Sequence, residues 1–127
     1  MKKCLLLIML FTISFSYSQD WKLLSESKNE ITFYKPNTEK TVWVKIASDK
    51  TEYYPNNTSQ KAVIVDGYRI VLFKFDCTTK KMGIIQSITY SNKGKILETF
   101  EKDDELIEMN YVTPDSNGET LFKVCCK

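Results

Sequence analysis

The chain has 127 residues, with 18 lysines and arginines against 16 aspartates and glutamates, and it contains no histidine. A net charge of +2 disfavours a strongly basic nucleic-acid binder. The lack of histidine removes the commonest general base and the commonest metal ligand, which most hydrolase designs and most zinc sites need. We therefore expect no catalytic residue, no metal site and no cofactor.

The first eighteen residues have the layout of a cleaved bacterial signal peptide. Two lysines near the start precede the apolar run 5–15, and serines stand at the −3 and −1 positions before Gln19. The apolar run is about half the length of the roughly 20 residues that span a bilayer, so we expect no membrane span. We predict that residues 1–18 are removed and that residues 19–127 form one domain in the periplasm, on the cell surface or outside the cell.

Runs rich in β-branched and aromatic residues, several of them alternating with polar residues, predict a series of strands. In chain order these runs cover residues 21–24, 30–34, 41–46, 62–65, 68–75, 82–90, 95–100 and 106–112. Residues 48–60 are mostly polar and predict a long exposed loop. The pair Asp66 and Gly67 predicts a tight hairpin, and the alternative is one long strand with a bulge at Gly67.

Start signals for a C-terminal helix lie at residues 113–115, where a threonine hydroxyl, a proline and an aspartate follow one another. Leu121 and Cys125 share one face of this helix at i, i+4 spacing. Gly118 lies near that face, and its missing side chain would let the helix lie close to a sheet. Because the helix is short, we expect it to need an external anchor.

Three cysteines follow the predicted cleavage point, namely Cys77, Cys125 and Cys126. In an oxidising compartment this odd number predicts one disulfide and one remaining thiol. Neighbouring cysteines rarely bridge each other, so Cys77 is expected to pair with the C-terminus. Cys125 is favoured because a continuing helix would turn Cys126 about 100° away from the Leu121 face. The remaining Cys126 would then be an inert thiol, a swap partner for Cys125 or the source of an intermolecular bridge.

Tyr53 and Tyr54 are the candidate partner-binding residues, because they are aromatic side chains inside the predicted polar loop. Aromatic residues on the predicted strands are instead expected to pack in the core or across strands. The acidic run 103–105 lacks the spaced oxygen ligands of a calcium loop and predicts a solvated turn.

The order of these motifs resembles the surface-adhesin protein E family. The chain carries an early Trp21, the strand end Phe75–Cys77, the helix start Thr113–Ser116 and the helix end Val124–Cys125, so the resemblance covers nearly all of residues 19–127. It implies an antiparallel sheet of about six strands, with a disulfide-tied C-terminal helix on the concave face. It also implies binding to extracellular-matrix proteins and plasminogen, as for the family's namesake, and an ability to form a homodimer.

We therefore predict an α+β fold in which a C-terminal helix is disulfide-tethered to one face of an antiparallel sheet. The function predicted is that of an exported, non-enzymatic module that presents its concave face or an edge strand to a protein partner. Two alternatives remain open, a passive subunit of an envelope assembly and a small exported inhibitor or enzyme.

Overall fold

The computed structural model describes residues 21–55 and 61–127. The predicted signal peptide, residues 1–18, lies outside the described residues, as does the predicted mature start at Gln19. Residues 56–60 of the predicted long loop also lie outside them. Within the described ranges, no helix has the length and apolar character needed to cross a membrane.

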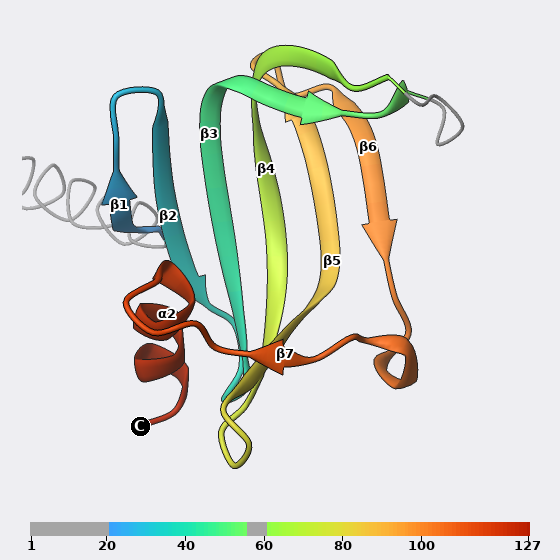
Figure 1. The fold of residues 1–127 in the computed structure, drawn as a ribbon. Coiled ribbons are helices and arrows are strands. Elements are labelled where there is room, and N and C mark those ends of the chain that lie inside the picture. The colour runs from blue at the N-terminus through green and yellow to red at the C-terminus, as the bar shows by residue number, and fades with distance from the viewer. Residues whose placement is uncertain (1–20, 56–60) are drawn as a thin grey trace, which may run out of the picture.

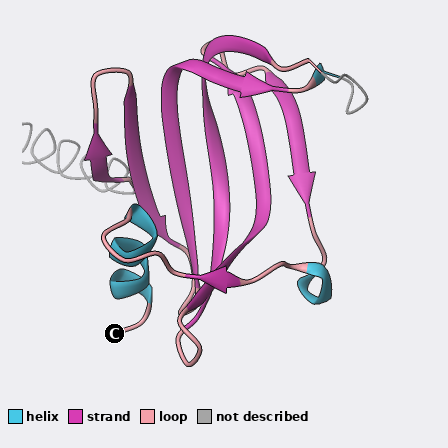
Figure 2. Cartoon of the chain, viewed as in Figure 1, coloured by secondary structure: helices cyan, strands magenta, loops and turns pink. Residues whose placement is uncertain are grey.

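Six antiparallel strands form a meander in which each strand pairs with the next along the chain (Figure 1). They are β1 (Lys22–Glu26), β2 (Glu30–Pro36), β3 (Thr41–Tyr53), β4 (Val63–Asp76), β5 (Lys81–Ser91) and β6 (Ile96–Glu101). The short strand β7 (Asn110–Tyr111) pairs with the start of β5. A short 3₁₀ helix, η2 (Asp104–Leu106), precedes β7, and helix α2 (Asn117–Cys125) follows β7 (Figure 2). The predicted α+β fold is confirmed.

Strand β4 runs without interruption through Asp66 and Gly67, so the predicted hairpin is wrong and the alternative of one long strand is confirmed. The irregularity in pairing lies beside it on β3, between Ser48 and Thr51. A Cβ atom on Gly67 would overlap the backbone carbonyl oxygen of Tyr90 on β5. The glycine therefore serves a close approach between two strands, where local sequence suggested a turn.

The predicted exposed loop 48–60 is also partly wrong, because its first residues continue β3. This end of β3 pairs with the start of β4, and two side chains, one from β4 and one from β6, also hold it. The Arg69 guanidinium of β4 donates to the Glu52 carbonyl, and the Glu98 carboxylate of β6 accepts from the Tyr54 backbone N–H at 2.7 Å. Both partners lie far away in the sequence, so the local polarity of the segment could not reveal this strand.

The core lies on one face of the sheet, here called the inner face. Residues at alternate positions of β3 and β4 point to it, and Val42, Val44, Val71 and Phe75 are all buried there. Helix α2 packs on this face through Leu121, which is also buried. The core is therefore small and concentrated where the helix covers the sheet.

The opposite, outer face carries half-buried aromatic side chains that pack across strands, as predicted for strand aromatics. The rings of Tyr68 and Tyr90 stack with their centroids 4.8 Å apart. The Lys45 ammonium lies 4.8 Å from the centroid of the Tyr68 ring. Such cross-strand contacts stabilise neighbouring strands without forming a second core.

Helix α2 begins later than predicted, since Ser116 rather than Thr113 is its N-cap. Asp115 has a φ of 60°, which lies in the left-handed region and prevents a helix from running through Pro114 into the following residues. The Ser116 hydroxyl accepts a hydrogen bond from the Glu119 backbone N–H at 3.3 Å. The same hydroxyl donates to the Thr113 carbonyl at 2.6 Å, which fixes the approach of the chain to the helix.

Candidate functional site

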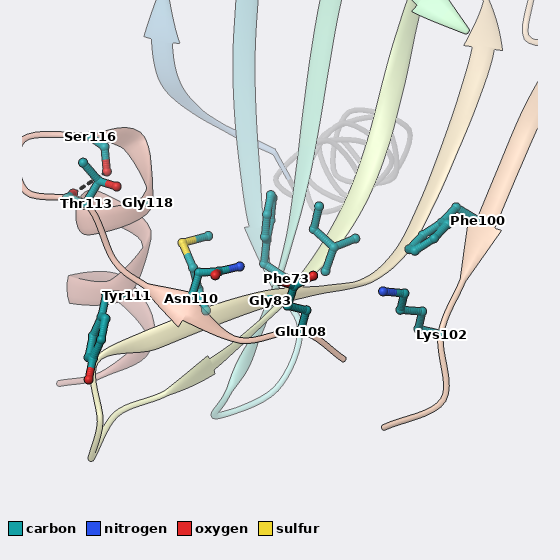
Figure 3. A pocket seen from close by; sticks show the side chains of 12 residues that line it. Phe73, Gly83, Phe100, Lys102, Glu108, Asn110, Tyr111, Thr113, Ser116 and Gly118 are labelled. Atoms are coloured by element: carbon teal, nitrogen blue, oxygen red, sulfur yellow. Dashed lines mark hydrogen bonds between the residues drawn. The ribbon is translucent and has the colours of Figure 1, made fainter. Parts of the chain in front are cut away.

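An open hollow of about 430 Å³ lies on the inner face, between β6 and the start of α2 (Figure 3). The sheet contributes Phe73 and Ile84 to its wall, and the edge strand β6 contributes Phe100. Further lining residues come from β7, from the segment after it and from the first turn of α2: Asn110, Tyr111, Thr113, Ser116 and Gly118. The hollow is thus built from segments that are distant in sequence.

The pairing along β5 explains why the hollow stays open. Strand β6 pairs with β5 only as far as Gln86, and β7 pairs only with the first two residues of β5. Between them the connecting segment approaches Gly83 on the outer face, where an added Cβ would lie 2.6 Å from the Ile107 Cγ2 atom and 2.7 Å from the Glu108 carbonyl oxygen. Among residues 21–55 and 61–127, no strand therefore covers the neighbouring side chains on the inner face.

Two large apolar side chains remain accessible in this hollow. Ile84 is 41% exposed and Phe100 is 41% exposed, although both point to the face that holds the core. Isolated exposed apolar residues are common, but two that share one recess form a surface that another molecule can cover.

The wall of the hollow carries one cation and one carboxylate, Lys102 and Glu108. The Lys102 ammonium lies 5.6 Å from the centroid of the Phe100 ring. The ion pairs found in the described part of the chain, Lys74 with Asp104 and Lys123 with Glu119, do not include Lys102. The hollow can therefore accept a molecule that carries an apolar group next to a charged one.

Tyr53 and Tyr54 do not line the hollow. Tyr53 is half-buried and pairs with Val63 at the end of β3, whereas Tyr54 is 47% exposed. Their role in partner binding stays a prediction.

Among the described residues, no group of three or more cysteines, aspartates or glutamates is placed to hold a metal ion.

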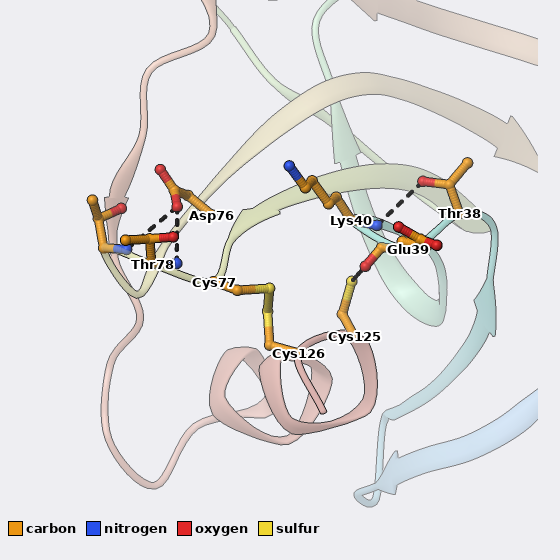
Figure 4. Close-up of a disulfide and its surroundings, with 9 residues drawn as sticks. Thr38, Glu39, Lys40, Asp76, Cys77, Thr78, Cys125 and Cys126 are labelled. Carbon is orange, nitrogen blue, oxygen red and sulfur yellow. Dashed lines mark hydrogen bonds between the residues drawn. A yellow bond between two sulfur atoms is a disulfide. The ribbon is translucent and has the colours of Figure 1, made fainter.

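The disulfide joins Cys77 to Cys126, so the predicted pairing of Cys77 with Cys125 is wrong (Figure 4). The Cα atoms of the two bonded residues are 5.5 Å apart. Helix α2 ends at Cys125, and Cys126 has a non-helical conformation with φ −107° and ψ 74°. The turn of 100° per residue, on which the prediction depended, therefore does not apply to Cys126. The predicted covalent link between sheet and helix is nevertheless present.

The turn that carries Cys77 is organised by Asp76. Its carboxylate accepts hydrogen bonds from the backbone N–H groups of Thr78 at 3.0 Å and Thr79 at 3.3 Å. Hydrogen bonds from Thr79, and then from Thr78, hold the pKa of Asp76 below its ordinary value. Asp76 thus has a structural role at the end of β4, where it shapes the turn beside the disulfide.

Cys125 is the free thiol of the described chain. Its Sγ atom donates to the Glu39 carbonyl at 3.1 Å (Figure 4), and burial raises the pKa of the thiol. A raised pKa means less thiolate at a given pH, so we expect alkylation of Cys125 by iodoacetamide to follow a profile displaced to higher pH than that of an unfolded control in urea. Mass spectrometry of the modified peptide measures this rate, and identical profiles for folded and unfolded protein would contradict the assignment.

Sequence reasoning missed the residues of the hollow, above all Ile84, Phe100 and Lys102. Strand alternation could have placed Phe100 and Lys102 on one face, because they are two positions apart. It could not show that this face is uncovered there, because that depends on where β6 and β7 stop pairing with β5.

Comparison with known proteins agrees with this architecture. The family model of surface-adhesin protein E matches residues 21–127, which include the whole sheet, the disulfide and the C-terminal helix. No curated protein and no solved structure matches the chain. Because the family model covers most of its length, the chain belongs to the surface-adhesin protein E family.

Proposed function

We propose that this protein is a non-enzymatic binding module of the cell surface or envelope, and that it holds a protein partner in the hollow on its inner face. The observation that carries the proposal is the pair Ile84 and Phe100, each 41% exposed in a recess of about 430 Å³. Protein interfaces concentrate their energy in such recesses, where an apolar anchor is buried inside a polar rim.

Family membership supports the class of partner. The family's description, surface-adhesin, denotes attachment to another molecule at the surface. Extracellular-matrix proteins are therefore the first class to test, and envelope proteins represent the alternative of a passive assembly subunit. Both alternatives use the same recess and differ in the partner.

The size of the effect follows from the area that the partner would cover. Complete burial of a phenylalanine side chain is worth about 1.5–3 kcal/mol, and part of the Phe100 side chain is already covered by its neighbours. Removing it should therefore cost about 1–2 kcal/mol of binding free energy, which is roughly a five- to thirtyfold rise in Kd.

The test compares Phe100→Ala with Leu23→Ala as a matched control. Leu23 is 57% exposed, but it lies on β1, at the opposite end of the strand order from β6. Surface plasmon resonance against purified matrix proteins and against purified envelope proteins gives Kd for each variant. We expect weaker binding for Phe100→Ala alone. Equal Kd values for both variants, or no binding to any protein of the two panels, would refute the proposal.

A further inference from the structure

We infer that the partner binds as an added antiparallel strand along the free edge of β6, and that it carries an acidic residue two positions before an apolar one. This inference rests on the proposed function and adds the chemistry of the segment that enters the hollow. It follows from the edge position of β6, from the alternation of its side chains and from the charge of Lys102.

Strand β6 is the last strand of the meander. It pairs with β5 on one side, and no strand in the described part of the chain pairs with its other edge. The Lys102 backbone N–H donates to the Ile85 carbonyl at 2.9 Å, so the chain keeps its alignment beside β5 one residue past the end of β6. The outer edge from Thr99 to Lys102 therefore offers unpaired backbone groups to an extended segment.

Alternation then places the hollow beside that edge. Phe100 pairs with Ser87 on the inner face, and Lys102 follows two positions later. Both line the hollow, and Figure 3 shows them side by side on its β6 wall. The residue of an added strand that lies opposite Phe100 would have its Cβ within about 4.5–5.5 Å of the Phe100 Cβ, at the mouth of the hollow. An apolar side chain at that position would cover Phe100 and narrow the mouth of the hollow that Ile84 also lines.

The position opposite Lys102 favours a carboxylate. Lys102 contacts the Phe100 ring and takes part in neither ion pair of the described residues. Glu108 lines the hollow from the segment that leads into β7, away from the β6 edge (Figure 3). Because the added strand is antiparallel, its residue opposite Lys102 comes two positions before the residue opposite Phe100. The recognised segment thus reads acidic, any residue, apolar.

A second copy of β6 is a competing occupant, since Glu98 precedes Phe100 by two positions. The Glu98 carboxylate, however, already accepts the hydrogen bond from the Tyr54 backbone N–H at 2.7 Å. In a second copy that carboxylate would have to leave Tyr54 in order to reach Lys102. The geometry therefore favours a partner of different sequence.

The experiment uses the purified, ¹⁵N-labelled protein and a synthetic seven-residue peptide of threonines with glutamate at position three and leucine at position five. We expect amide chemical-shift changes that map to β6 and to Ile84 as the peptide is added. Changing the peptide glutamate to lysine should weaken binding about fivefold, as for one partly exposed ion pair. The Lys102→Glu variant should bind this lysine peptide as tightly as the unaltered protein binds the glutamate peptide. A peptide with N-methylated backbone on the pairing side should lose binding, because it cannot form the strand hydrogen bonds.

Three results would overturn the inference: no shift changes at millimolar peptide, undiminished binding of the N-methylated peptide, or a dimer in analytical ultracentrifugation that Thr99→Pro dissociates. Failure here is distinguishable from failure of the proposed function. If matrix or envelope proteins bind in a Phe100-dependent manner while the peptide does not, then only the strand-addition mode is wrong.

Discussion

Cys77→Ser should lower the free energy of unfolding by about 4 kcal/mol and release helix α2 from the sheet. The disulfide from Cys77 to Cys126 spans a sequence separation of 49 residues. In the chain-entropy model, closing a loop of this size lowers the entropy of the unfolded chain and so raises its free energy by about 4 kcal/mol. A helix of nine residues is marginal in isolation, so without the bridge it depends on the packing of Leu121.

Chemical denaturation measures the loss of stability, and hydrogen exchange of residues 117–125 measures the release of the helix. Cys125→Ser is the matched control, because it removes a cysteine from the same helix but leaves the disulfide intact. It should cost no more than about 1 kcal/mol, the worth of one weak hydrogen bond. Equal losses in the two variants, or unchanged protection of the helix in Cys77→Ser, would contradict the role of the bridge.

Phe75→Ala should destabilise the fold by about 3–5 kcal/mol, the range for truncation of a fully buried phenylalanine. Phe75 is 0% exposed, and its ring meets the Phe122 ring edge-on with the centroids 6.2 Å apart. The substitution would leave a cavity between the sheet and α2. Thermal unfolding followed by circular dichroism measures the effect, and Phe75→Leu provides a milder variant if the alanine variant does not fold.

Phe100→Ala is the control for this prediction, since it is the same substitution on the same face of the sheet. Phe100 lies in the open hollow, so its loss leaves no closed cavity and should cost about 1 kcal/mol or less of stability. The Phe75 substitution should therefore mainly lower stability, and the Phe100 substitution should mainly weaken binding. Similar unfolding midpoints for both variants would refute the division of the inner face into a packed core and an open site.

The bridge and the hollow are also physically connected. Ser116 and Gly118, at the start of α2, line the hollow, and an added Cβ on Gly118 would lie 2.9 Å from the Met82 Sδ atom. The glycine thus lets the helix lie close to the sheet, as its place in the sequence predicted. The backbone from β7 holds the start of this wall and the disulfide holds the end of α2, so loss of the disulfide would loosen one wall of the site.

Several errors of the sequence-based predictions share one cause, the use of a local rule where a distant contact decides. Asp66 and Gly67 match a hairpin turn, yet Gly67 is needed for the approach of Tyr90. The segment after Ser48 is polar, yet it remains a strand because Thr51–Tyr53 pair with Val63–Val65 of β4, and side chains of β4 and β6 also bind backbone groups there. The prediction that Cys125 forms the disulfide assumed that the helix continues through Cys126, whereas the helix ends at Cys125.

Residue patterns alone were enough to predict the α+β class, the positions of most strands, the terminal helix and the link from Cys77 to the C-terminus. Side-chain periodicity and the number of cysteines are local properties, so they can be read without coordinates. That Cys126 forms the disulfide bond, and that Ile84 and Phe100 stay uncovered, could be seen only in the folded chain. Exposure depends on which segments meet along β5, and bond partners depend on where the helix ends. Both are set by contacts between residues that are far apart in the chain.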